Sequence, residues 1–217
     1  MTRLPRIATA VQQPYVADLT PAQMRDRLHE ALTIYVQAMG YPASVARRRA
    51  PMWAEHALRP GWRAAAVLAP PRAHDRPAHA ALPQADLHGT LLGIAYGYTG
   101  ASQQWWYEQV RRGLTRTHGS AAAAQLLQDY FELTELHIHP SAQGNGLGDA
   151  LLGQLLAGCP ASRVLLSTPE VVGESNRAWR LYRRRGFEDV LRDFRFDGDP
   201  RAFAVLGRAL PLATTTA

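Results

Sequence analysis

The stretch FELTELHIHPSAQGNGLGDALLGQLLAG, from Phe131 to Gly158, decides how this chain folds. It begins with strand-forming residues, turns at Pro140, passes through a glycine-rich segment and then enters a leucine-rich pattern with helical spacing. The sequence therefore predicts a strand, a glycine loop and a helix in that order. Glycines let a backbone come close to a bound group, and the first amides of a helix lack internal partners. Such a loop is suited to hold a phosphate.

Several protein families place a glycine loop before a helix, and the residues that follow the glycines distinguish them. A P-loop ends in Gly-Lys-Ser or Gly-Lys-Thr, but here Gly148 is followed by Asp149 and Ala150, and the chain contains no lysine. A dinucleotide-binding fingerprint would need a glycine at position 149 and normally lies early in the chain. The sequence therefore disfavours both phosphoryl transfer of the P-loop kind and dinucleotide binding.

The pattern that remains is Gln143-x-x-Gly146-x-Gly148, which follows an extended segment ending in Ile138-His139-Pro140. It resembles motif A of the GCN5-related N-acetyltransferase (GNAT) superfamily, in which the loop holds the pyrophosphate of acetyl-coenzyme A (acetyl-CoA). The resemblance implies that the strand bonds the pantetheine arm and that the loop binds the pyrophosphate. The residues assigned to these two roles are Leu136, His137 and Ile138 in the strand, and Gln143, Gly144, Asn145, Gly146, Leu147 and Gly148 in the loop.

A second motif follows at Asn176-x-Ala178-x-x-x-Tyr182-x-x-x-Gly186-Phe187. It resembles motif B of the same superfamily, whose helix lies beside the cofactor. The resemblance implies that Asn176 contacts the pantetheine or its neighbourhood. It also implies that Tyr182 faces the thioester sulfur and protonates the leaving thiolate. Two motifs in this order, separated by a short strand, are a more specific signal than either alone.

Direct acetyl transfer also needs a base, because the acceptor amine must lose a proton before it attacks. The predicted strand offers two carboxylates, Glu132 and Glu135. In simple alternation Glu135 shares a face with His137, whereas Glu132 shares one with Leu136. The corresponding strand of the family commonly carries a bulge that breaks this alternation, so both residues remain candidates. Glu135 is favoured because it begins the Glu-Leu-x-Ile-x-Pro pattern that is often seen in these enzymes.

The histidines do not form a metal-binding pattern. His137 and His139 lie two residues apart, but no third ligand is nearby in the sequence. His74, His79 and His88 lie in a segment rich in proline and alanine, and their spacing fits no compact site. We therefore expect no metal cofactor.

The composition indicates one globular domain over residues 1–217. Apolar residues make up 47% of the chain, which is enough to bury a full core at this length. The first residues lack a long apolar run, and no stretch approaches 18 to 20 apolar residues, so we expect a cytoplasmic enzyme rather than a secreted or membrane protein. The single cysteine, Cys159, cannot form an internal disulfide and is expected to pack at a helix end.

The chain is basic, with a formal net charge of +6. Its arginines cluster at Arg47–Arg49, Arg111–Arg112 and Arg183–Arg185, each within a helical pattern where a charge run usually forms a solvated face. No nucleic-acid-binding motif surrounds them, so we expect no nucleic-acid partner. Arginines also suit a ligand that carries several phosphate charges.

Along the chain, the periodicity predicts an α/β protein with a mixed, mostly antiparallel and twisted sheet flanked by helices. An exposed loop is expected at 70–88, and a helical insertion at 100–128 before the key strand. Within that insertion Trp105 and Trp106 are adjacent, so they cannot share one helix face, and packing against neighbouring elements is the favoured role. The remaining predicted elements are strands at 6–16, 62–68, 91–98, 163–167, 187–196 and 202–207, and helices at 21–39, 44–58 and 174–182.

The resemblance thus implies an N-acetyltransferase that moves an acetyl group from acetyl-CoA to an amine by direct transfer. The acceptor is expected to be a small-molecule or peptide amine, and a homodimer is possible on this fold. The alternative is a non-catalytic sensor or interaction module that binds acyl-CoA. The retained Tyr182 and strand carboxylates favour the enzyme. Because the chain has no lysine, only its N-terminus could serve as an amine for self-acetylation.

Overall fold

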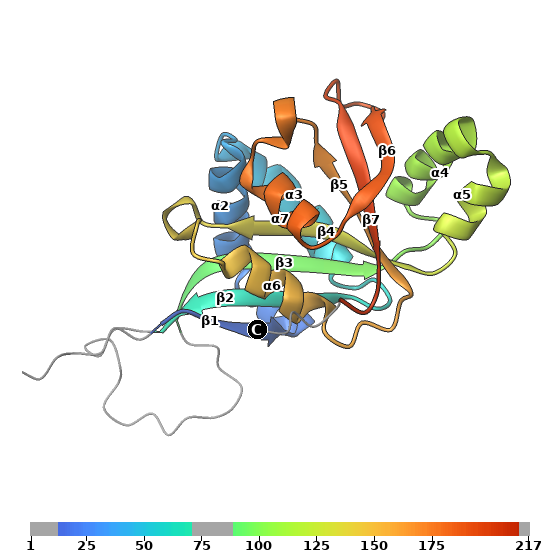
Figure 1. Ribbon diagram of the computed structural model, residues 1–217. Coiled ribbons are helices and arrows are strands. Elements are labelled where there is room, and N and C mark those ends of the chain that lie inside the picture. The colour runs from blue at the N-terminus through green and yellow to red at the C-terminus, as the bar shows by residue number, and fades with distance from the viewer. Residues whose placement is uncertain (1–12, 71–88, 213–217) are drawn as a thin grey trace, which may run out of the picture.

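A seven-stranded sheet forms the centre of the computed structural model, which describes residues 13–70 and 89–212 (Figure 1). The strand order is β1-β2-β3-β4-β5-β7-β6, and every neighbouring pair is antiparallel except β4 and β5. The predicted mixed, mostly antiparallel sheet is therefore confirmed. The strands are β1 (Tyr15–Leu19), β2 (Arg63–Ala69), β3 (Thr90–Thr99), β4 (Tyr130–Ile138), β5 (Arg163–Pro169), β6 (Glu188–Phe194) and β7 (Phe203–Ala209).

The parallel pair β4 and β5 divides the sheet into two halves. These strands are paired only at their beginnings, where residues 130–132 lie opposite residues 163–165. Beyond that point β4 stays paired with β3, and β5 stays paired with β7. Figure 1 shows the consequence, because β5, β6 and β7 rise steeply away from the direction of β1 to β4.

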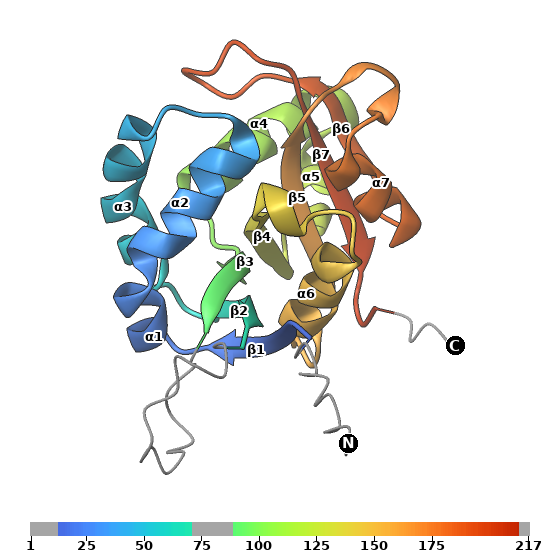
Figure 2. The same ribbon diagram turned by 90° about the vertical axis from the view of Figure 1, so that its left-hand side faces the viewer.

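Helices cover both faces of this divided sheet. α6 and α7 pack on one face, α2 and α3 pack on the other face of β1 to β4, and α4 and α5 lie beside β6 and β7 (Figures 1 and 2). None of the helices in the described part of the chain is long and apolar enough to cross a membrane. The helices are α1 (Pro21–Asp26), α2 (Leu28–Met39), α3 (Ser44–His56), α4 (Trp105–His118), α5 (Ser120–Leu126), α6 (Leu147–Leu156) and α7 (Arg177–Arg184), with short 3-10 turns η2 (Pro140–Ala142) and η3 (Val172–Glu174).

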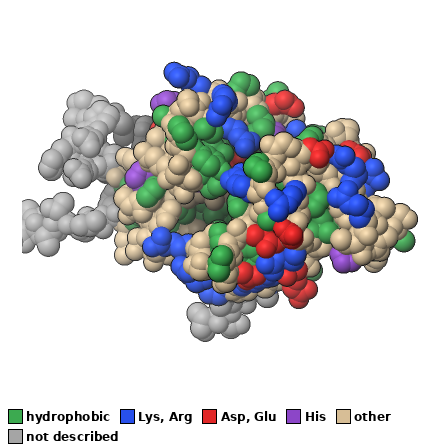
Figure 3. Space-filling model, turned by 90° about the horizontal axis from the view of Figure 1, so that it is seen from above, with side chains coloured by type: hydrophobic (Ala, Val, Ile, Leu, Met, Phe, Trp, Pro, Cys, Tyr) green, Lys and Arg blue, Asp and Glu red, His purple; other side chains and the backbone are tan. Residues whose placement is uncertain are grey.

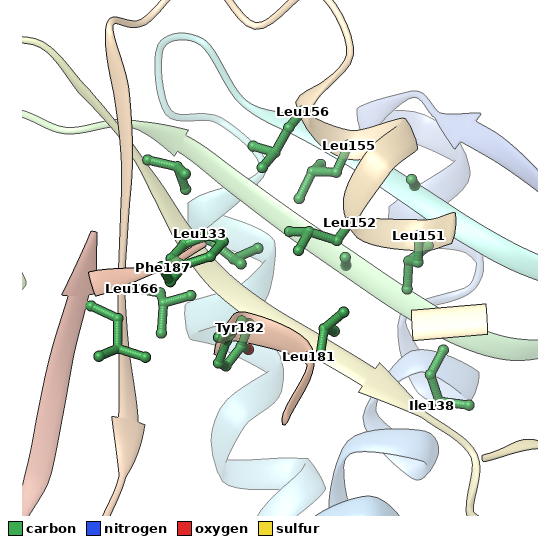
Figure 4. Close-up of a cluster of buried hydrophobic side chains, with 14 of the residues drawn as sticks. Leu133, Ile138, Leu151, Leu152, Leu155, Leu156, Leu166, Leu181, Tyr182 and Phe187 are labelled. Atoms are coloured by element: carbon green, nitrogen blue, oxygen red, sulfur yellow. The ribbon is translucent and has the colours of Figure 1, made fainter. Parts of the chain in front are cut away.

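The leucine-rich helix after the glycine loop supplies much of the core. Its four buried leucines recur at the spacing that turns one helical stripe toward the sheet. Figure 4 shows these side chains together with those of α7 and of strands β4 and β5. Cys159 is half-buried and packs against the same cluster, as expected. The four leucines are Leu151, Leu152, Leu155 and Leu156.

The first predicted helix is divided into α1 and α2. Its beginning is confirmed, since Thr20 Oγ1 accepts from Gln23 N at 3.2 Å and Gln23 Oε1 accepts from Thr20 N at 2.8 Å. This capping box fixes Pro21 in the first turn. The helix is interrupted at Arg27, whose φ of −103° and ψ of 11° are not helical. Helical periodicity continues across the break, which is why the sequence predicts one helix.

Most predicted boundaries lie within two residues of the observed ones, and two elements differ by more. β1 begins at Tyr15, so the prediction of a strand at 6–16 is correct only at its end, while residues 1–12 lie outside the described residues. α7 begins at Arg177, three residues after the predicted start, because Gly173 and Glu174 have left-handed φ values of 63° and 51°. Of the predicted loop at 70–88, residues 71–88 with their three histidines also lie outside the described residues.

The helical insertion before β4 is confirmed, and it consists of α4 and α5. Trp106 is buried, and its Nε1 donates to Ser167 Oγ at 3.2 Å. Trp105 points the other way, is 56% exposed and stacks on Phe196 with 5.5 Å between ring centroids. Both rings therefore contact elements of the C-terminal half, which agrees with the packing role favoured from the sequence.

Candidate active site

The glycine loop leaves β4 through η2 and is held by its own polar side chains. Gln143 Nε2 donates to the carbonyl of Ile138 at 3.0 Å, and Asn145 Nδ2 donates to the carbonyl of Ala142 at 3.2 Å. Gly144 and Gly146 have left-handed φ values of 89° and 75°, which a residue with a side chain rarely adopts. These contacts fix the loop, and no side chain of residues 13–70 or 89–212 covers its two left-handed glycines.

The loop opens directly into α6. Gly146 occupies the N-cap position, and the first intrahelical bond runs from Asp149 N to the Gly146 carbonyl at 3.0 Å. A Cβ atom placed on Gly144 or Gly146 would meet none of the described residues within 4 Å. The amides of Leu147 and Gly148 therefore lie at a helix N-terminus beside open space, which is the geometry that binds phosphate.

A cleft of about 600 Å³ lies beside this loop, where β4 and β5 part. Its walls come from β4, the loop, the end of β5, α7 and the last turn of α2. Seen from above, the surface is hollowed between apolar and arginine side chains (Figure 3). The sequence-predicted residues that line it are Glu135, Leu136, His137, Ile138, Gln143, Gly144, Gly146, Leu147, Gly148, Asn176 and Tyr182, whereas Glu132 and Asn145 do not.

A β-bulge in β4 determines which side chains face α2 and α3. Glu132 lies opposite Tyr98 and Glu135 lies opposite Tyr96, so the single step from Tyr96 to Gly97 on β3 leaves Thr134 as an extra residue on β4. Opposed residues point to the same face of a sheet. Glu132 and Glu135 therefore share one face, and simple alternation, which would separate them, is wrong for this strand.

Glu132 is the deeper of the two carboxylates. It is only 3% exposed, and Tyr98 donates its hydroxyl to Oε1 at 2.9 Å. The other oxygen, Oε2, is buried without a hydrogen-bond partner among the described residues. Burial raises the pKa of this carboxyl from 4.5 to about 7, although the Tyr98 hydrogen bond opposes the shift. A carboxyl with this pKa exchanges protons near neutral pH.

Glu135 lies in the wall of the cleft and is paired with a histidine. Its Oε2 is 2.6 Å from His137 Nε2, and the His137 ring packs edge-on against Tyr35 at 5.1 Å between centroids. Burial and then the negative charge of Glu135 raise the pKa of Tyr35 to about 12. The negative charge of Glu135 therefore helps to keep the nearby Tyr35 hydroxyl protonated.

Tyr182 faces the cleft from α7. Asn176 is the N-cap of this helix, and its Oδ1 accepts from Trp179 N at 2.9 Å. Gly186, with a left-handed φ of 73°, follows the helix end, as the motif predicts. Tyr182 is buried, and burial followed by the charge of Glu135 raises the pKa of its hydroxyl well above the ordinary value. The hydroxyl is therefore protonated at neutral pH and able to donate.

No cluster of three or more His, Cys, Asp and Glu side chains with metal-binding geometry is present in residues 13–70 and 89–212. His139 does not line the cleft, and its Nδ1 lies 2.7 Å from Ser141 Oγ. His137 is engaged by Glu135. His137 and His139 therefore contact different side chains and do not form a pair.

Several cleft residues were not identified from the sequence. Arg177, Arg180 and Arg184 line the cleft from α7, although the sequence suggested only a solvated face for the run at 183–185. Their spacing of three and four residues was the available signal, because it places them on one side of a helix. Tyr35, which lies against His137, had no sequence signal beyond the apolar stripe of α2.

The comparisons with known proteins agree with this geometry. A family model described as an acetyltransferase (GNAT) domain matches residues 101–189. A relative from Mycobacterium tuberculosis, named GCN5-like protein acetyltransferase Rv2170, is 54% identical over 203 residues, which cover 91% of this chain and 98% of the relative.

Solved structures share the fold at much lower identity. The ribosomal-protein-S18-alanine N-acetyltransferase from Escherichia coli has a TM-score of 0.53 at 15% identity, covering 94% of this chain and 99% of that one. An acetyltransferase from Thermus thermophilus has a TM-score of 0.53 at 17% identity, covering 92% and 99%. Since the Mycobacterium relative matches nearly along its whole length, this chain belongs to the GNAT superfamily of acetyltransferases.

Proposed function

We propose that this chain transfers the acetyl group of acetyl-CoA directly to an amine of its acceptor. The observation that carries the proposal is one cleft that combines a glycine loop at a helix N-terminus with Glu135 and Tyr182 in its wall. A phosphate-bearing donor, a base and an acid are the three requirements of the reaction.

The donor would lie along β4. From Leu133 onward, the edge of β4 that faces β5 has no strand partner within the described residues. Backbone groups of Leu136, His137 and Ile138 on this strand are suited to hydrogen-bond the amide groups of the pantetheine arm. Residues 143–148 would hold the pyrophosphate through their amides and the first turn of α6. Acetyl-CoA supplies the thioester, and the chain positions it.

Glu135 is the base that we favour, because it lines the cleft and its charge reaches the Tyr182 hydroxyl. The acceptor ammonium would pair with this carboxylate and pass a proton to it, and the neutral amine would then attack the thioester carbonyl. Glu132 is the alternative base. Its pKa of about 7 suits proton exchange, but its carboxyl lies outside the cleft wall and would reach an amine only through water.

Tyr182 would act as the acid in the last step. When the carbon–nitrogen bond has formed, the carbon–sulfur bond breaks and the sulfur leaves as a thiolate. A tyrosine whose pKa is raised by burial keeps its proton at neutral pH and would deliver it to the thiolate. The nitrogen of the new amide would lose its extra proton, which restores the tyrosine hydroxyl. Backbone amides of β4 are the available donors for the negative charge that develops on the carbonyl oxygen.

The acceptor is proposed to be an amino group of a small molecule or of a peptide. The name of the Mycobacterium relative describes a protein acetyltransferase, which supports the peptide class at 54% identity. The fold itself does not select between them.

The test is thioester consumption, measured as release of the free CoA thiol with a panel of amines and amino-terminal peptides. We expect turnover by the wild-type chain. Tyr182→Phe should lower the turnover number by about 100-fold, with acetyl-CoA affinity by calorimetry changed little. Glu135→Gln should lower the rate at neutral pH while leaving donor affinity intact.

Two results would contradict parts of this proposal. Tight acetyl-CoA binding without turnover for any amine would identify the chain as a sensor of acyl-CoA. A normal turnover number in Tyr182→Phe, under conditions where chemistry limits the rate, would remove the acid role. If Glu132→Gln abolishes turnover and Glu135→Gln does not, the buried carboxylate is the base.

A further inference from the structure

One face of α7 presents a row of arginines to the cleft. Arg177, Arg180 and Arg184 all line it, and their spacing of three and four residues places them on the same side of the helix. The opposite side is buried in the core through Trp179 and Leu181. The row therefore forms a cationic wall of the cleft beside the glycine loop.

The neighbouring arginines on α7 are neutralised by carboxylates. Arg183 pairs with Glu174 at 2.6 Å and with Asp189 at 2.5 Å. Arg185 makes a bidentate pair with Asp149, with Nε 2.6 Å from Oδ1. These pairs connect α7 to η3, to β6 and to the first turn of α6.

The three arginines of the row lack such close partners. Arg177 Nη1 donates to the neutral side chain of Gln143 at 3.1 Å, and Arg180 donates to a backbone carbonyl. Arg184 donates weakly to another carbonyl at 3.4 Å and approaches Asp149 only to 4.0 Å, where that carboxylate already binds Arg185. Among the described residues, no carboxylate lies within 3.5 Å of the row to balance its charges, so an anionic ligand is the fitting partner.

The row flanks the whole glycine loop. Arg177 touches Gln143 at the beginning of the loop, and Arg184 lies near Asp149 in the first turn of α6. The loop can hold a pyrophosphate through backbone amides alone. Full positive charges beyond those amides match a further phosphate, which guanidinium groups bind in paired hydrogen bonds.

Resting on the proposed function, in which CoA is the ligand of the cleft, we propose that Arg180 and Arg184 bind the 3′-phosphate of its ribose. Arg177 is already engaged by the loop, so it would stay with the pyrophosphate. The pair at 180 and 184 thereby makes the protein select CoA over 3′-dephospho-CoA, which is otherwise the same molecule.

The experiment compares the affinities of CoA and 3′-dephospho-CoA by calorimetry. We expect the wild-type protein to prefer CoA by about 10- to 100-fold, the range for hydrogen bonds to a charged group. In the double variant Arg180→Gln with Arg184→Gln, this preference should fall to about threefold or less, while the affinity for 3′-dephospho-CoA stays unchanged. That unchanged affinity also verifies folding. The control is Arg47→Gln with Arg48→Gln, which removes the same charge from exposed positions on α3.

Three outcomes overturn the inference, and they are distinguishable from one another. If the double variant keeps the wild-type preference, these arginines do not bind the 3′-phosphate. If it loses affinity for both ligands equally, the row attracts anions generally. If the wild-type protein binds neither ligand, the proposed acyl-CoA function fails as well, and the inference fails with it.

Discussion

Replacing Glu132 with glutamine should change how the stability of the protein depends on pH. The carboxyl is almost fully buried, and burial raises its folded-state pKa from 4.5 to about 7. The folded protein therefore prefers the protonated form more strongly than the unfolded chain does. The contribution of the protonated Glu132 carboxyl to the free energy of unfolding is fully present below pH 4.5 and is lost as the pH rises through about 7. Glutamine cannot ionise, so the variant lacks this loss.

The magnitude follows from the separation of the two pKa values. Each pH unit between the folded and unfolded pKa corresponds to about 1.4 kcal/mol. The pKa of Glu132 is 4.5 in the unfolded chain and about 7 in the folded protein. At pH 8.5, where the carboxyl is ionised in both states, this difference lowers the free energy of unfolding by about 3 kcal/mol. That is a large fraction of the about 5 to 15 kcal/mol by which domains are stable.

The assay is urea unfolding of the wild-type protein and Glu132→Gln at pH values from 4.5 to 8.5. The informative quantity is the difference between their free energies of unfolding, because other titrating groups cancel in it. Across this range the wild-type protein should lose on the order of 3 kcal/mol relative to the variant. Tyr98→Phe removes the hydrogen bond that opposes the raised pKa, so it should increase the loss. Parallel stability curves for wild type and Glu132→Gln would refute the reasoning.

Three further predictions concern stability in denaturant. Leu152→Ala removes a fully buried side chain between α6 and the sheet and should cost about 3 to 5 kcal/mol; a loss below 1 kcal/mol would mean that the core refills the site. Trp106→Phe keeps most of the packing but removes the hydrogen bond to Ser167, so a loss of about 1 kcal/mol is expected, and a midpoint equal to wild type would count against that bond. Gly146→Ala should cost about 1 to 2 kcal/mol through its left-handed φ, whereas Gly148→Ala, whose added methyl would be 3.5 Å from its nearest neighbour, is the matched control without such a loss.

The sequence predicts the centre of the fold because its signals there are local. The glycine loop, the leucine stripe of α6 and the motif from Asn176 to Gly186 each depend on spacing within one segment. Their positions relative to one another follow from the GNAT resemblance. The cleft therefore contains most of the residues that the sequence assigns to the donor.

Features that depend on distant residues could not be predicted. Glu132 is buried because β3 supplies Tyr98 from 34 residues away. Within the run Arg183 to Arg185, the first and last arginines pair closely with carboxylates of other elements, including Asp149, 36 residues earlier, whereas Arg184 does not. A sequence window reports a charge run but not which members are neutralised in three dimensions.

The bulge at Thr134 has a consequence for reading strands of this kind. The side chains of β4 that pack on the α6 side are Phe131 and Leu133 before the bulge, and Leu136 and Ile138 after it. The apolar positions thus change from odd to even numbers within one strand. A single extra residue produces this change of parity, since every residue after it moves to the other face. A switch of parity among the apolar residues of a strand therefore indicates a bulge. In β4 the switch places the bulge between Leu133 and Leu136.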